Sequence, residues 1–404
     1  MKWVSHGLAW LLLIALIVFA PTAPKMLPNT SEGLASENYA QWAGVLRLWV
    51  STGWQPGGGF IPWFNQAVAR FERRNPGVYV QVESASDEKL KAFASEGANP
   101  PDMIVFSPSM LASPERLLPL GAHSQILNAL QNVGMWRGVK YAEPVAMGGY
   151  AWAINTRYLS GAPLGEITLP PPAKKGTPLF LIQAPGDGAY VSWSGALLSL
   201  CLHTPQAELS PDARAPVGDG IDLGLATPIP APEAVPEATS RAASQILSLP
   251  AILPENFRAQ SSALSDFLNG RAAAIPVTQF EIRKLEQRSE QGRCPDWAVI
   301  PGEAAYTDQL ALFAITNFAR EDVAARQQFS AQLLELLLDD TSQKALSSAR
   351  ALRTTTGAQL YTGQSPMAAL ERGYLGGFIS APNAFDARFR SLAQARLGAA
   401  LRGH

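Results

Sequence analysis

The sequence predicts an α/β protein organised around a parallel sheet. Between residues 44 and 109, three apolar or alternating runs are separated by two helical patterns. The expected strands are 45–50, 78–82 and 103–106, and the expected helices are 61–74 and one that begins at 87. Alternation at these lengths is typical of a parallel sheet with crossover helices. Ligands of such sheets bind beyond the carboxyl ends of the strands, so the loops that follow these strands are the first candidates for a binding site.

A stripe of apolar residues spaced by four and three predicts the first helix: Phe64, Val68 and Phe71. The helix is expected to end at Asn75-Pro76-Gly77, because proline cannot continue it and glycine tolerates a left-handed turn. Ser86 is the expected cap of the second helix.

The alternation continues along the chain. Gly148 and Gly149 lie between expected strands at 139–145 and 151–155, and two adjacent glycines suit a crossover between lobes. Later strands are expected at 179–183, 272–277, 297–302 and 310–315. Later helices are expected at 238–249, 262–268 and 281–291, and the C-terminal third is expected to be helical.

Length and composition limit the class of protein. The chain has 404 residues, of which 47% are hydrophobic and 16% charged, with a formal net charge of -1. About two domains are expected for this length. The charge balance argues against a nucleic-acid partner, because such proteins carry a basic stripe or patch.

The N-terminus, residues 1–24, reads as an export signal or a membrane anchor. Lys2 precedes a short apolar run at 8–20, which has the length of a signal peptide's apolar region. The cleavage signal is poor because a proline follows each of the best cut sites, Ala20 and Ala23. Cleavage and retention both stay open. Residues 25–43 are expected to be a linker, and the protein is expected at the cell surface, in the periplasm or outside the cell.

Cysteine and histidine give little sign of a metal site, so no metal or cofactor is expected. The two cysteines, Cys201 and Cys294, could form a disulfide in an exported chain or stay as buried thiols. The four histidines are scattered. Residues 204–236 are rich in Pro, Ala and Asp and are expected to form an irregular surface excursion.

The order of several motifs resembles an extracellular solute-binding protein of an ABC importer, of the sugar-binding type. The segments that carry the resemblance are Leu48-Trp49 with its glycine loop, Phe71 to Val78, Pro101 to Phe106, Glu143 to Tyr150, and Phe267 to Ile275. Two features depart from that family. Its bacterial members often carry a lipid-anchored N-terminal cysteine, which is missing here, and 204–236 has no obvious counterpart.

The resemblance implies a two-lobed periplasmic-binding-protein-like fold with a hinge and an interlobe cleft. The expected boundaries put 44–146 and 271–317 in lobe 1, and 147–270 and 318–404 in lobe 2. The implied function is capture of a small-molecule solute, a sugar or a related compound, for delivery to an ABC permease in the membrane. Two alternatives are a binder of an anionic or phosphorylated solute and a membrane-anchored sensor or adaptor module.

A sugar cleft needs flat aromatic faces and a few polar groups, since sugar faces are partly apolar and their hydroxyls need partners. The candidate ligand-binding residues follow or adjoin expected strand ends: Trp54, Ser84, Ser107, Ser109, Gly149, Tyr150, Asp187, Tyr190, Trp193 and Gln279. Each has a structural alternative, which is core packing for the aromatics, helix capping for the serines and a turn for Asp187. Trp54 is favoured as a contact because it lies among glycines and is harder to bury.

The glycine loop at 57–59 has a second interpretation. Exposed N–H groups before a helix can hold a phosphate or a carboxylate, although no Gly-Lys-Ser/Thr of a Walker motif follows. No enzyme is expected, because the sequence has no nucleophile motif and nothing pairs Asp102 with Glu143 as the two carboxylates of a glycosidase.

Overall fold

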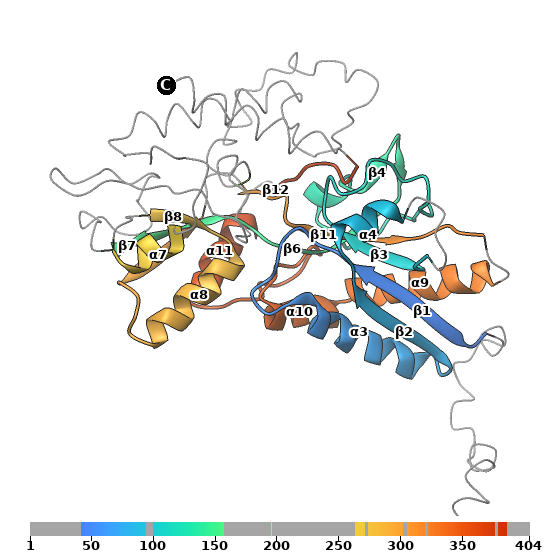
Figure 1. Ribbon diagram of the computed structural model, residues 1–404, viewed down its shortest axis with the longest axis horizontal. Coiled ribbons are helices and arrows are strands. Elements are labelled where there is room, and N and C mark those ends of the chain that lie inside the picture. Colours follow the sequence, from blue (N-terminus) through green and yellow to red (C-terminus); the bar gives the residue numbers. More distant parts are fainter. Residues whose placement is uncertain are drawn as a thin grey trace, which may run out of the picture. The chain divides into compact units, whose positions relative to one another are not determined.

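The computed structural model describes residues 42–93, 100–156, 195, 263–270, 274–301, 305–319, 322–375 and 379–385 (Figure 1). The predicted export segment, the excursion at 204–236, the strand at 179–183 and the helix at 238–249 lie outside these residues. The described residues from Gly44 onward belong to one compact unit. Among its described helices, none combines the length and the hydropathy that a membrane span needs.

A five-stranded sheet, here sheet A, contains the three predicted strands of the first stretch. The strand order is β2-β1-β3-β11-β6. β1 (Gly44–Val50) lies between β2 (Val78–Ser84) and β3 (Met103–Phe106) and is parallel to both, as predicted. β11 (Leu310–Ile315) is antiparallel to β3 and to β6 (Glu143–Met147), so the complete sheet is mixed. Every residue of β11 is buried, which fits its continuous apolar run.

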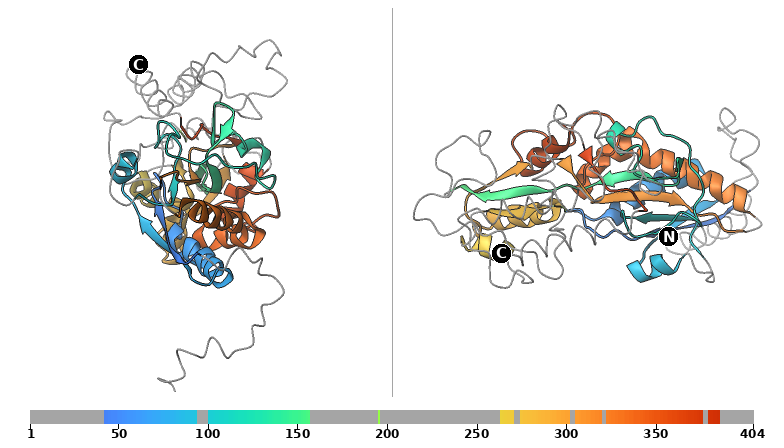
Figure 2. Two further views of the ribbon diagram at one scale, coloured as in Figure 1. Left: turned by 90° about the vertical axis from the view of Figure 1, so that its right-hand side faces the viewer. Right: turned by 90° about the horizontal axis from the view of Figure 1, so that it is seen from above.

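The helices that pack on sheet A come from both ends of the sequence (Figures 1 and 2). α3 (Phe60–Arg74) begins one residue before the predicted start and buries the predicted stripe. It packs on β2, on α9 (Val323–Leu338) and on α10 (Asp340–Ala349). α4 (Asp87–Ala92) is capped by Ser86, whose hydroxyl accepts the Lys89 N–H. Both predicted helix boundaries follow from capping chemistry.

A three-stranded sheet, here sheet B, has β7 (Ala151–Asn155) at its centre. β8 (Ala274–Val277) and β9 (Trp297–Pro301) are both antiparallel to β7. The helices that pack on sheet B or on one another beside it are α7 (Ala263–Leu268), α8 (Gln279–Glu290) and α11 (Pro366–Leu375). α8 begins two residues before its predicted start, because Thr278 and Glu281 form a capping box there.

Five short elements complete the described part. β4 (Met135–Trp136) and β5 (Val139–Lys140) form a hairpin, so the strand pair expected at 139–145 divides between this hairpin and β6. β10 (Ala305–Tyr306) pairs with β12 (Ile379–Ser380). A single 3₁₀ turn, η1, covers Asn128–Leu130.

The predicted lobe boundaries do not follow the two sheets. Residues 271–317 were expected with 44–146, but β8 and β9 pair with β7 of sheet B. Residues 318–404 were expected with the second lobe, but α9 and α10 pack on α3 of the sheet A part. Periodicity predicts that a segment is a strand or helix, whereas its sheet is decided by long-range pairing.

Candidate functional site

The loops predicted to form the site leave sheet A at the same end of its strands, the carboxyl end of β1, β2 and β3. Val50 pairs with Ser84 and with Val105, and Met147 pairs with Leu310. The loops that follow β1, β2, β3 and β6 therefore start side by side. This arrangement agrees with the expectation that carboxyl ends of parallel strands gather candidate ligand contacts.

Trp54 is buried in the loop after β1. Its side chain is 2% exposed and meets the ring of Phe60 edge-on, with 4.9 Å between ring centres. The expectation that neighbouring glycines would keep it from being buried is therefore wrong. Its indole Nε1 has no hydrogen-bond partner in the described part of the chain. A buried N–H without a partner is costly, so this indole is an unsatisfied polar group inside the loop.

Close packing requires glycine at Gly58, and the backbone conformation favours glycine at Gly59. A side chain at Gly58 would clash with the Ser348 carbonyl and lie 2.9 Å from the Ala349 Cα. The Gly58 N–H donates to the Ala349 carbonyl at 2.8 Å. Gly59 has φ of 87° and caps α3 without a side-chain hydrogen bond. Because one loop N–H is already bonded to backbone, the loop is a packing element more than an open anion cradle.

The three candidate serines have different environments. Ser84 is exposed at the end of β2. Ser107 is 3% exposed; its hydroxyl donates to the Leu310 carbonyl at 3.1 Å and accepts the Gly53 N–H at 3.2 Å. Ser109 has φ of 68°, and its N–H donates to the Ala384 carbonyl at 3.0 Å. Ser107 therefore fastens the glycine loop to β11, while Ser84 is open to solvent.

Gly149 and Gln279 meet at the crossover from β6 to β7. The Gln279 side chain accepts the Gly149 N–H at 3.2 Å and donates to the side-chain oxygen of Gln309 at 3.0 Å. It also donates to the Gln55 carbonyl at 3.4 Å. Gln279 is fully buried, so it links sheet A loops to the start of α8. Its amide is occupied by protein partners in this arrangement.

Two segments of the crossover are bonded to each other. The Gly148 N–H donates to the Gln309 carbonyl at 2.7 Å, and the Thr307 hydroxyl donates to the Gly148 carbonyl at 2.8 Å. A side chain at Gly148 would meet the amides of Gln279 and Gln309. The predicted need for glycine at this crossover is therefore steric as well as conformational.

Tyr150 is held by two buried partners. Its N–H donates to the Tyr374 hydroxyl at 2.7 Å, and its own hydroxyl donates to Asp308 Oδ1 at 2.5 Å. Burial raises the pKa of Tyr374 well above its ordinary value, and the hydroxyl donates to the Tyr306 carbonyl at 2.7 Å. Tyr374 thus stays protonated and fixes the backbone at Tyr150.

The segment Tyr306 to Gln309 and the residue Tyr374 were not predicted as part of the site. The only local signal was a polar run, Thr307-Asp308-Gln309, directly before an apolar strand. Asp187, Tyr190 and Trp193 lie outside the described residues. No group of residues able to hold a metal ion occurs among those that the structure describes.

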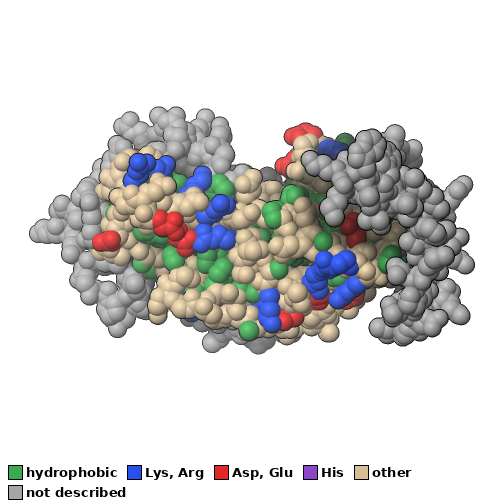
Figure 3. All heavy atoms as spheres, turned by 90° about the horizontal axis from the view of Figure 1, so that it is seen from below, with side chains coloured by type: hydrophobic (Ala, Val, Ile, Leu, Met, Phe, Trp, Pro, Cys, Tyr) green, Lys and Arg blue, Asp and Glu red, His purple; other side chains and the backbone are tan. Residues whose placement is uncertain are grey.

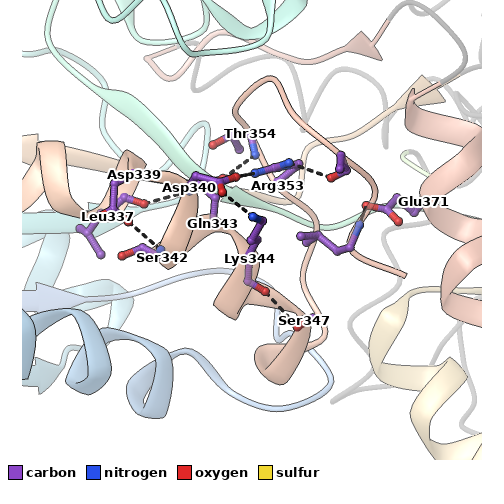
Figure 4. A network of polar contacts seen from close by, with 12 residues as sticks. Leu337, Asp339, Asp340, Ser342, Gln343, Lys344, Ser347, Arg353, Thr354 and Glu371 are labelled. Atoms are coloured by element: carbon purple, nitrogen blue, oxygen red, sulfur yellow. Dashed lines mark hydrogen bonds and ion pairs between the residues drawn. The ribbon is translucent and has the colours of Figure 1, made fainter. Parts of the chain in front are cut away.

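A polar network fixes the connection from α10 to α11 beside this edge (Figure 4). Gln343 donates to the Val145 carbonyl of β6 at 2.8 Å and accepts the Thr354 N–H at 3.0 Å. Arg353, 1% exposed, donates to Asp340 at 3.0 Å. Glu371 accepts N–H groups at 360 and 361. Leu352 exchanges two backbone hydrogen bonds with Met147, so this segment extends the sheet edge.

Charges on the face shown in Figure 3 are mixed. Lys and Arg side chains stand next to Asp and Glu side chains, with no extended region of one sign. This pattern differs from the basic stripe of a nucleic-acid interface.

The fold is the two-lobed, periplasmic-binding-protein-like α/β fold, as predicted, and solved structures show the likeness. A sugar-binding protein MalE from Xanthomonas citri has a TM-score of 0.60 and 16% identity, over 89% of this chain and 92% of that one. A maltodextrin-binding protein from L. casei BL23, without ligand, has a TM-score of 0.56 and 15% identity, over 90% and 94%. An ABC substrate-binding protein from Listeria monocytogenes in complex with cycloalternan has a TM-score of 0.53 and 11% identity, over 90% and 97%.

The sequence matches no model of a protein family and no curated protein. These three solved structures are of binding proteins by name. At these identities the likeness concerns the fold.

Proposed function

We propose that this chain is an exported solute-binding protein that captures a sugar, of oligosaccharide size, for an ABC permease. The observation that carries the proposal is the near-complete overlap, about nine-tenths of each chain, with sugar-binding proteins of this fold. Binding without turnover is part of the proposal. Export, and a place at the cell surface or in the periplasm, rest on residues 1–24.

The proposed contacts lie at the carboxyl edge of sheet A and at the crossover. Trp54 would donate its unpartnered Nε1–H to a sugar hydroxyl. Ser84 would offer an exposed hydroxyl from the loop after β2. At the crossover, Gly149, Tyr150 and Gln279 would form the base of the proposed sugar site. Ser107, Ser109, Asp187, Tyr190 and Trp193 complete the proposed set of ligand-binding residues.

Isothermal titration calorimetry of the full chain tests the proposal. The panel is maltose, maltotriose, cycloalternan, mannobiose and chitin oligosaccharides, with glucose 6-phosphate and citrate for the anionic alternative. We expect dissociation constants in the micromolar range for one neutral class. Binding of the anions alone would replace the sugar assignment, and release of shorter sugars on incubation would make the protein an enzyme.

Trp54→Phe tests the proposed indole contact once a sugar is known. The change keeps an aromatic ring against Phe60 but removes the N–H donor. We expect the dissociation constant to increase about tenfold. This factor corresponds to about 1.4 kcal/mol, the contribution of one hydrogen bond. Trp49→Phe is the matched control, because the Nε1 of Trp49 also has no partner in the described residues but belongs to β1. If both substitutions change the dissociation constant equally, the Trp54 indole does not contact the sugar.

The third alternative, an anchored sensor or adaptor, concerns the N-terminus. Sequencing of the mature N-terminus from expressed protein separates a cleaved from a retained segment. A retained segment with no sugar binding in the calorimetry would favour the anchored module.

A further inference from the structure

Arg350 adopts a backbone conformation that normally belongs to glycine. It ends α10 with φ of 55° and ψ of 42°, in the left-handed region. Its N–H closes the helix by donating to the carbonyls of Leu346 and Ser347. Glycine is the usual residue at such a helix end because a Cβ is strained there. An arginine in this conformation costs energy that glycine or asparagine would largely avoid. This cost suggests that the Arg350 side chain has a role.

The Arg350 side chain reaches from the sheet A part to α8, which packs on sheet B. Its guanidinium donates to the Glu286 carboxylate on α8, and the two side chains are 26% and 22% exposed. Its stem covers Gly57, where an added Cβ would lie 2.9 Å from Arg350 Cβ. A glycine at position 350 would have no side chain and could not contact Glu286 or Gly57.

A second contact joins the same two regions one turn earlier on α8. Arg283 donates to the Gly57 carbonyl of the glycine loop. The same loop is fixed to α10 through the Gly58 N–H. Loop, helix end and α8 therefore form one cluster, made of Gly57, Arg283, Glu286 and Arg350.

We propose that this cluster is a latch between the two sheet-bearing parts of the molecule. The latch stabilises the arrangement described here, and it opens when α8 moves away from the glycine loop. Its ion pair is partly exposed, so its contribution is small and sensitive to salt. A latch of this strength biases a conformational equilibrium without locking it. The proposal concerns motion and does not depend on the identity of the solute.

Distance measurement between two spin labels tests the latch in solute-free protein. The labels are placed at Gln66 on α3 and Gln287 on α8, both exposed, with Cys201 and Cys294 changed to Ser. We expect one dominant, narrow distance population and a minor second one in the parent protein. Glu286→Gln and Arg350→Gly should each raise a second population at least about threefold.

Three comparisons make the result decisive. Glu290→Gln, an exposed carboxylate one turn along α8, should leave the distances unchanged. The double variant should match either single variant, because both remove the same ion pair. NaCl at 0.5 M should broaden the parent distribution and leave the variants unaffected.

The two single variants differ in backbone strain, which separates opening from misfolding. Arg350→Gly relieves the left-handed strain, whereas Glu286→Gln does not change it. Unchanged distances in both variants, or a change that Glu290→Gln reproduces, would overturn the latch. Because no sugar is used, this outcome is independent of the calorimetry.

Discussion

At the scale of single residues, Tyr150 joins the chain crossover to a buried carboxyl. It was predicted as a ligand contact, yet its hydroxyl donates to Asp308 within the protein. Both side chains are buried, at 1% and 7% exposure. A hydrogen bond in such a place is stabilising, and its loss leaves the acceptor short of one partner.

Tyr150→Phe should therefore lower the free energy of unfolding by about 1–3 kcal/mol. The substitution keeps the ring and removes only the hydroxyl. Urea denaturation followed by circular dichroism measures the change. Tyr79→Phe is the control, since Tyr79 is 58% exposed and its substitution should stay within about 0.5 kcal/mol. A cost no larger than that of the control would show that the bond to Asp308 is energetically unimportant.

His123 connects β6 to α9 through two carboxylates. Its Nδ1 lies 2.9 Å from Glu143 Oε1 and its Nε2 lies 3.0 Å from Glu335 Oε1. Lys140 also faces Glu143, at 2.6 Å. The hydrogen bond with Glu143 raises the pKa of His123 above its ordinary value of 6.5, although burial opposes the rise.

The raised pKa makes the contribution of His123 depend on pH. A group with a higher pKa in the folded state stabilises fully below its unfolded pKa, about 6.5, and loses the effect as pH rises through the folded pKa. Melting temperatures of wild type and His123→Gln should therefore differ most near pH 5.5 and converge above the folded pKa. If the melting temperatures of the two proteins differ by the same amount at every pH from 5.5 to 8.5, the titration of His123 does not contribute to stability.

The sequence could place Gln279 after a strand but could not identify its partners. It was expected to contact a hydroxyl of the ligand. The structure instead bonds it to Gly149 and Gln309, which are separated from it by 130 and 30 positions. Such partners are brought together by pairing of distant strands, which no local pattern encodes.

At the scale of elements, the glycine loop after β1 is shaped by what packs on it. Its glycines were read either as a wall of the cleft or as an anion cradle. The backbone of Ser348 and Ala349 lies so close that no side chain fits at Gly58.

Gly58→Ala should destabilise the protein by about 1–3 kcal/mol, because the clash is with backbone that cannot rotate away. Gly121→Ala is the matched control, since no atom lies within 4 Å of the position its Cβ would occupy. Differential scanning calorimetry of both variants measures the difference. Equal melting temperatures would mean that α10 shifts to accept the methyl group.

Elements with strong periodicity were predictable, and their pairing was not. The ranges of β1, β3 and α3 agree with the prediction to within a residue or so. The antiparallel direction of β11 was not predicted, because an apolar run carries no sign of its orientation. The same reason explains why the pairing of β8 and β9 with β7 was not predicted.

At the scale of the whole molecule, the described residues that connect the two sheets include 148–150, 305–309 and 350–365. The first two are bonded through Gly148 and Gln309, and the third lies beside β6 at Leu352. Gln279 adds a side-chain link between sheet A loops and α8. These ties couple the stabilities of the two sheets.

Urea unfolding should therefore be one coincident transition by tryptophan fluorescence and by circular dichroism. Tryptophans report from both sheets, with Trp49 in β1 and Trp152 in β7. Gln279→Ala should move both transitions to lower urea together. Fluorescence and circular dichroism midpoints that separate would show that the sheets unfold independently.

The inner position of β11 also affects when the fold can form during synthesis. β11 lies between β3 and β6, although about 160 residues separate it in sequence from β6 and about 200 from β3. A nascent chain that has emerged only as far as β7 has β3 and β6 without the strand that joins them. Contacts of such long sequence separation form slowly. For a chain that we propose is exported, this delay leaves time for translocation before sheet A closes.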